Sequence, residues 1–310
     1  MKSKTVTILT SVLVGSLLTT LATAQQPSRV LGRRGVINKP ERRPAQTTAR
    51  ATPKLKLMVY AFDVAFQFGA VDLRSGAFLP IGPALPPDVG DGLVQGPGTS
   101  LLSLGFEGNL IAIEPATGTT SVVGATGLGD CTTPASPCGP NSALWIGLID
   151  GHYYVTDFAN NLYSLDPMTG ATRLIGPTGM PGLTTPPFSE NADGSFNVVA
   201  ASLFGFRGKF YAYFATFTVN FANGTLTPVI PGEIYQIDPA TGHATPVAPM
   251  ETVSTMVTVN DMVYGFNGAT GEVLILDPTT GQTSPLSSLD PALAVIAGAT
   301  PARPAPAAAH

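Results

Sequence analysis

Apolar and polar positions along this chain follow one pattern that returns five times. Each copy has a short apolar run, an acidic residue, a turn that ends in Gly, and a second run rich in Thr and apolar residues. The copies span residues 68–82, 110–124, 162–176, 234–248 and 273–287. Such a repeat predicts a propeller or solenoid, because one unit cannot bury its own apolar face and must stack on neighbours.

The repeat itself reads as two antiparallel strands joined by a tight turn. Residues 162–165 and 273–276 are apolar at nearly every position, which is typical of a strand buried on both faces. The acid precedes Pro in four copies, and the turn Gly supplies a positive φ. We therefore interpret the five acids as turn residues rather than as a catalytic or calcium-binding ring. They are Asp72, Glu114, Asp166, Asp238 and Asp277.

Further strand-like runs precede the repeat and complete a unit of four strands. Residues 144–149 and 152–156 flank an Asp-Gly pair before the third copy, and similar pairs of runs precede the fourth and fifth copies. The first unit starts near Leu55 and lacks one strand, whereas residues 292–297 form an unpaired apolar run. We predict an all-β fold, a β-propeller of about five four-stranded blades closed by the C-terminal strand. Six blades is the alternative, if a long connector contains a degenerate blade.

The chain divides into four segments. Lys2 and Lys4, an uncharged stretch and a small-x-small site at residues 22–24 predict a signal peptide over residues 1–24, with a membrane anchor as the alternative. Residues 25–54 form a basic disordered arm, residues 55–300 the propeller and residues 301–310 a disordered tail. No later segment is apolar for long enough to span a bilayer, so we expect a secreted or periplasmic protein that is not membrane-spanning.

The charges are unevenly distributed. Eight of the 16 Lys and Arg lie in residues 25–54, whereas the sequence from Leu55 onward carries 19 of the 20 Asp and Glu and is negative by 13 charges. An acidic body repels phosphate backbones, which argues against nucleic acid as the partner of the folded domain. The arm has too little apolar content to fold. It is open to three interpretations: a solvated linker, a contact with anionic surfaces, or a segment that folds back on the acidic body.

Two cysteines, Cys131 and Cys138, lie in a Pro-rich stretch with six residues between them. In an oxidising compartment this spacing favours a disulfide that closes a tight loop. Two thiols without a nearby His do not make a zinc site, and the spacing is not that of a C-x-x-C redox pair.

The phrase L-Y-x-L-D-P-x-T-G at residues 162–170 resembles the repeats of quinoprotein-like and YVTN-type β-propellers, which are common in exported bacterial proteins. The resemblance covers roughly residues 55–300 and implies the propeller fold. Quinoprotein alcohol dehydrogenase repeats end in a Trp that docks between blades, at positions where this chain has residues such as Ile175 and Val247. This departure argues against a pyrroloquinoline quinone cofactor.

Candidate ligand-binding residues lie mostly on the long connectors between units, because binding residues concentrate on loops of a rigid frame. These connectors span residues 83–98, 125–141 and 177–197. The candidates are Asp88, Asp91, Asp130, Trp145, His152 and Asp193. No Ser-His-Asp or H-E-x-x-H set can be assembled, so we name no catalytic or metal-ligating residue and no cofactor. The carboxylates on the connectors are compatible with a bound divalent cation, and this alternative stays open.

The sequence thus favours an exported β-propeller without enzymatic activity that binds a protein, a glycan or a small molecule at its loop-rich axial face. One alternative is a metal-dependent hydrolase or lyase of the lactonase kind, with its site at the propeller axis. A second alternative is a structural component of the cell envelope. Neither the ligand nor the oligomeric state follows from the sequence.

Overall fold

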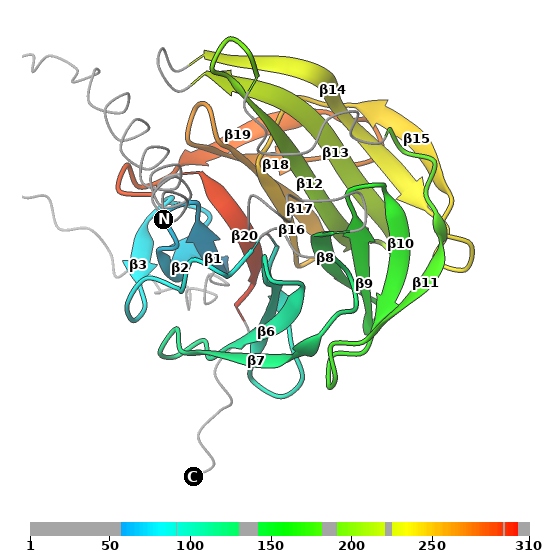
Figure 1. The fold of residues 1–310 in the computed structure, drawn as a ribbon. Helices are drawn as coiled ribbons and strands as arrows, with labels where there is room; N and C mark the ends of the chain where they lie inside the picture. Colours follow the sequence, from blue (N-terminus) through cyan, green and yellow to red (C-terminus); the bar gives the residue numbers. More distant parts are fainter. Residues whose placement is uncertain are drawn as a thin grey trace, which may run out of the picture.

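The fold is a ring of five four-stranded antiparallel sheets (Figure 1). The computed structural model describes residues 57–90, 92–129, 142–181, 191–220, 225–293 and 295–302. Every regular element in these ranges is a strand, as predicted, and none of these residues belongs to a helix able to cross a bilayer. The predicted signal peptide and basic arm, together with Asp91, Asp130 and both cysteines, fall outside the described residues.

Each blade runs from an inner strand at the axis to an outer strand at the rim. Blade 1 consists of β20 (Ile296–Pro301), β1 (Met58–Asp63), β2 (Phe68–Asp72) and β3 (Phe78–Pro80). Blade 2 consists of β4 (Val94–Gln95), β5 (Leu101–Leu104), β6 (Asn109–Ile113) and β7 (Thr120–Ala125). Blade 3 consists of β8 (Ala143–Ile149), β9 (His152–Asp157), β10 (Asn161–Leu165) and β11 (Thr172–Pro177). Blade 4 consists of β12 (Phe196–Phe206), β13 (Lys209–Asn220), β14 (Thr225–Ile237) and β15 (Ala244–Pro249). Blade 5 consists of β16 (Thr255–Val259), β17 (Met262–Asn267), β18 (Glu272–Leu276) and β19 (Thr283–Ser288).

The last strand closes the ring, as the sequence predicted. β20 pairs antiparallel with β1, with Val59 opposite Pro301 and Ala61 opposite Ala299, and the two lie side by side in Figure 1. The strand starts four residues later than the predicted apolar run, at Ile296. The apolar run alone predicts the wrong first residue for this strand. The paired stretch includes Gly298 and Thr300, and its register is set by pairing with β1.

The repeat turns behave as predicted. Each of the five acids accepts a hydrogen bond from the backbone N–H two residues later, as in Asp277 to Thr279 at 2.9 Å. The turn glycines all have positive φ, from 70° at Gly281 to 83° at Gly242. A Cβ on Gly281 would lie 2.1 Å from the carbonyl oxygen of Pro249, in the preceding blade. This Gly is therefore required for blade-to-blade contact as well as for the turn.

Blade 4 is longer than the others. β13 and β14 pair as far as Asn220 and Thr225, and the pair projects past the neighbouring blades in Figure 1. β15 pairs with β14 only from Glu233 to Ile237, so residues 225–230 form an edge. Pro228 lies on this edge and offers no N–H, which limits pairing with another strand.

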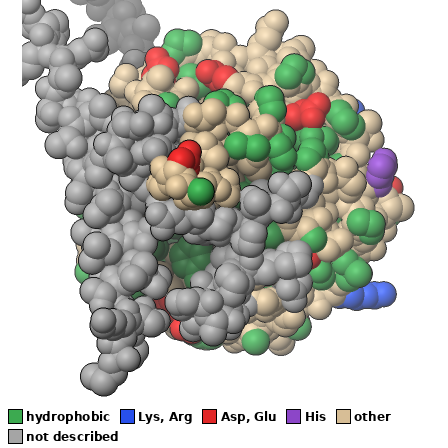
Figure 2. All heavy atoms as spheres, turned by 45° about the horizontal axis from the view of Figure 1, so that its top comes forward, with side chains coloured by type: hydrophobic (Ala, Val, Ile, Leu, Met, Phe, Trp, Pro, Cys, Tyr) green, Lys and Arg blue, Asp and Glu red, His purple; other side chains and the backbone are tan. Residues whose placement is uncertain are grey.

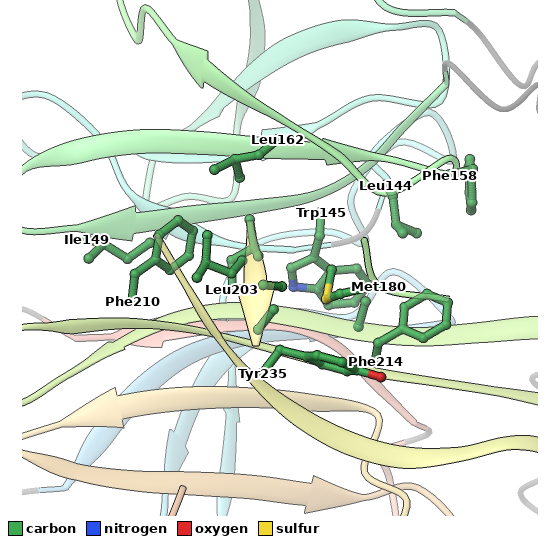
Figure 3. Close-up of a cluster of buried hydrophobic side chains, with 14 residues drawn as sticks. Leu144, Trp145, Ile149, Phe158, Leu162, Met180, Leu203, Phe210, Phe214 and Tyr235 are labelled. Atoms are coloured by element: carbon green, nitrogen blue, oxygen red, sulfur yellow. The ribbon is translucent and has the colours of Figure 1, made fainter. Parts of the chain in front are cut away.

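The hydrophobic core lies between the blades. The largest cluster joins blades 3 and 4, with Trp145 and Met180 in its middle, Ile149 and Phe210 at one end and Phe158 at the other (Figure 3).

The two ends of this cluster lie toward the two ends of the ring. Turns of two residues lead from inner to second strands at one end, which we call the turn end. Connectors from each outer strand to the next inner strand reach the opposite end, which we call the connector end.

Candidate functional site

The sequence-predicted residues that the structure describes do not meet in one place. Asp88 and Asp193 lie on connectors at the connector end, whereas His152 begins β9 at the turn end and is exposed. Trp145 is 4% exposed and packs in the core between blades 3 and 4. Ligand binding at these residues stays a prediction, and they do not form a single cluster.

The connector-end carboxylates have local structural partners. Asp193 Oδ1 accepts hydrogen bonds from the Ser195 hydroxyl at 2.6 Å and from its backbone N–H at 3.0 Å. These bonds lower the pKa of Asp193. The backbone carbonyl of Asp88 accepts from the N–H of Phe106 at 2.9 Å, which ties the connector to blade 2. Among the described residues, no group of three or more His, Cys, Asp or Glu is arranged to hold a metal ion.

Two buried carboxylates are turn caps. Asp157 is fully buried, and its Oδ1 accepts from the Asn161 N–H at 2.8 Å while its Oδ2 accepts from the Tyr163 hydroxyl at 2.9 Å. Burial and then this hydrogen bond raise the pKa of Tyr163 to about 12. Asp63 caps the equivalent turn of blade 1 through the N–H groups of Ala65 and Gln67. Both acids thus fix turns at the connector end of the second strands.

A groove of about 520 Å³ opens at the turn end, between blades 3 and 4. It is lined by Ile149, Asp150, His152 and Tyr154 of blade 3, and by residues 208–210 and 236–239 of blade 4. Its volume lies within the roughly 300–1,000 Å³ that is usual for ligand pockets. We take this groove as the candidate functional site.

Aromatic side chains form the floor of the groove. The ring of Tyr154 lies 4.9 Å from the ring of Phe210, centroid to centroid, at an angle of 37°. Phe210 is 3% exposed, whereas Tyr154 is only half-buried and reaches the groove. Burial, and then the negative charge of Asp150, raises the pKa of Tyr154. The phenol is therefore neutral at pH 7 and offers a hydroxyl beside an apolar ring.

The rim of the groove carries both signs of charge. Asp150 and Asp238 contribute carboxylates, and Lys209 donates a hydrogen bond from Nζ to Gln236 Oε1 at 3.2 Å. Asp238 also accepts from the N–H of Ala240 at 2.9 Å and from the Thr241 hydroxyl at 2.8 Å, and these bonds lower its pKa. The two carboxylates outnumber the one ammonium of Lys209, so these three groups give the rim a net negative charge.

The wider surface is also acidic. Within the described ranges, the cationic side chains are those of Arg74, Arg173, Arg207 and Lys209. In the uncovered part of the face in Figure 2, Lys and Arg side chains appear only near the edge, while Asp and Glu lie among hydrophobic patches. Such a surface favours the approach of positively charged ligands.

Sequence reasoning found one groove residue, His152, and missed the rest. Tyr154, Phe210 and Lys209 look like ordinary strand residues, because the strand pattern alone does not show which side chains border a seam between blades. A signal was present in the aligned turns Asp-Gly-His at residues 150–152 and Arg-Gly-Lys at residues 207–209. These two turns have opposite charges at their first position.

No family model and no curated protein matches this sequence. Solved structures resemble it at low identity. A nidogen/laminin complex is 11% identical with a TM-score of 0.45, covering 78% of this chain and 97% of that one. A Bacteroides thetaiotaomicron protein of unknown function is 14% identical with a TM-score of 0.45, covering 74% of this chain and 55% of that one. BamB from Moraxella catarrhalis is 14% identical with a TM-score of 0.32, covering 74% and 70%. The β-propeller assignment rests on the sheet pairing described above, and these distant likenesses say nothing further about function.

Proposed function

We propose that this protein is an exported β-propeller that acts as a binding module, with the blade 3–4 groove as its ligand site. The observation that carries the proposal is the groove itself, in which the half-buried Tyr154 lies on Phe210 inside a rim with charges of both signs. An aromatic floor with a few polar groups around it is typical of sites that bind and orient a ligand. The rigid blades on both sides hold the site without an ordering cost.

A binding screen tests the proposal. The chain from Gln25 onward is titrated with blocked amino acids, short peptides and cell-wall oligosaccharides, and binding is followed by calorimetry and by NMR shifts of the aromatic signals. We expect a ligand whose binding is lost in Tyr154→Ala and kept in Tyr264→Ala. Tyr264 is the matched control, because it occupies the same position in blade 5, two residues after the first residue of the second strand.

Three outcomes would count against the proposal. One is the absence of any ligand from the panel that depends on Tyr154. Another is a ligand that Tyr264→Ala affects equally. The third is turnover of the bound compound, which would favour the hydrolase or lyase alternative. If Tyr154→Ala does not fold, as judged by circular dichroism, Lys209→Ala replaces it, because Lys209 is exposed.

Export is a separate part of the proposal and needs its own test. It is supported by the basic start and small-x-small site of residues 1–24. Expression in a bacterial host followed by fractionation and N-terminal sequencing would place the protein outside the cytoplasm and starting at Gln25. A cytoplasmic protein with an intact Met1 would contradict export and leave the binding proposal standing.

A further inference from the structure

The blade 3–4 groove has a filled counterpart at the next seam of the ring. Asp150 and Arg207 are the first residues of equivalent two-residue turns, with φ of 50° and 51°, and each is followed by Gly. The flanking pairs correspond as well: Ile149 lies opposite His152, and Phe206 lies opposite Lys209. The two seams can therefore be compared residue by residue.

At the blade 4–5 seam, the chain supplies its own guanidinium. Arg207 Cζ lies 4.8 Å from the centroid of the Phe206 ring. The charge of Arg207 also contributes, after the hydrogen bonds of Thr279 and Thr280, to the lowered pKa of Asp277, and it lowers the pKa of Tyr211 against burial and the charge of Asp277. The exposed Arg207 thus places a planar cation over an aromatic side chain, and its charge acts on the carboxylate that follows the third strand.

At the blade 3–4 seam, the same surroundings lack that cation. Tyr154 corresponds to Tyr211 and Asp238 corresponds to Asp277, while Ile149 and Asp150 replace Phe206 and Arg207. The smaller Ile149 leaves the space of the groove, and Asp150 adds a second carboxylate where the neighbouring seam has a guanidinium. Lys209 does not restore the charge balance, because it adds one positive charge to a lining with two carboxylates, and its ammonium is hydrogen-bonded to Gln236.

We propose that the blade 3–4 groove binds the guanidinium group of an arginine side chain, beside Tyr154 and the carboxylates of Asp150 and Asp238. This inference rests on the proposed function and names its ligand class. A guanidinium suits the site better than an ammonium, since its flat face stacks on Tyr154 while its edge donates to carboxylates.

Two sources could supply the arginine. Residues 25–54 of this chain contain six arginines, and they precede β1, which begins at the turn end, where the groove lies. A basic segment of a partner protein would present the same chemistry. The side chain that binds is the same in both cases, and the experiment separates the sources.

The test titrates the chain from Gln25 onward with N-acetyl-arginine methylamide, using NMR. The matched probe is the citrulline analogue, which has the same shape and no charge. To keep the arm from competing, its six arginines are replaced by Gln. We expect the arginine probe to bind at least about tenfold more tightly than the citrulline probe, because hydrogen bonds to charged groups are stronger than neutral ones.

Two substitutions at one position locate the binding. Asp150→Asn should weaken the arginine probe about tenfold. Asp150→Arg should abolish binding, because it replaces a carboxylate of the groove by a cation, and Arg207 shows that the turn accepts Arg at this φ. Asp261→Asn is the control, since Asp261 lies in the equivalent turn of blade 5. It should leave binding unchanged.

The outcomes separate this inference from the proposed function. Equal binding of the two probes, or undiminished binding by Asp150→Arg, would overturn the guanidinium assignment. A Tyr154-dependent ligand from the wider screen that lacks a guanidinium would overturn it too, yet leave the binding module standing. With the natural arm restored, weaker probe binding would identify the arm as the source, and unchanged binding would indicate a partner. Either of these last two results supports the assignment.

Discussion

The seams on either side of blade 4 are built from the same repeat, yet one is open and the other is filled. At the blade 4–5 seam, Phe206 is 8% exposed and Tyr211 only 2% exposed, with Arg207 over the Phe206 ring. At the blade 3–4 seam, the smaller Ile149 leaves Tyr154 half-buried beside a groove. The backbone turn is the same in both. A repeat therefore fixes the frame, and single side chains at equivalent positions decide where a site opens.

The largest effect should come from emptying the filled seam. Phe206→Ala removes a buried aromatic ring and should lower the free energy of unfolding by about 3 kcal/mol, measured by urea denaturation. Ile149→Ala should cost less, about 2 kcal/mol, because it removes a smaller side chain. Equal costs would mean that the two seams are packed alike, and the comparison would fail.

A smaller and equal effect should follow from changing the second turn residue in each seam. Gly151 has a φ of 81° and Gly208 a φ of 69°, and a Cβ at either would meet nothing within 4 Å. Gly151→Ala and Gly208→Ala should therefore each lower the free energy of unfolding by about 1 kcal/mol through backbone strain alone. Clearly different costs would show that the turns do not share one geometry.

The smallest effect concerns the two tyrosines. Burial first and Asp150 second raise the pKa of Tyr154; burial and Asp277 raise the pKa of Tyr211, which Arg207 lowers. Asp150→Asn should therefore lower the pKa of Tyr154, and Arg207→Gln should raise that of Tyr211, as followed by NMR titration of the tyrosine ring carbons. Shifts in the same direction would contradict the assigned charges.

These raised pKa values also set the direction of a pH dependence. Because both phenols have folded pKa values above the unfolded value of 10.0, the unfolded state loses its protons first as the pH rises. Stability should therefore fall as the pH rises above about 10. Asp150→Asn should make this loss smaller, because it brings the folded pKa of Tyr154 nearer to the unfolded value.

Most of the frame could be predicted from the sequence, because turn chemistry is local. Asp277, its following Pro and Gly281 specify one turn by hydrogen bonding and φ, and the same phrase returns five times. The start of β20 was misplaced because Gly298 and Thr300 carry no apolar signal and take their register from β1. The groove could not be predicted from the strand pattern, since its two halves meet only after blades 3 and 4 pack.

The pairing of β20 with β1 has a consequence for how the protein is made. Val59 is synthesised long before its partner Pro301. Until then, blade 1 keeps an open inner edge, and the ring cannot lock. A chain truncated before Ile296 would keep that edge exposed, and it would be open to proteases and to strand exchange with other chains. The ring therefore closes only after the whole propeller sequence has been translated.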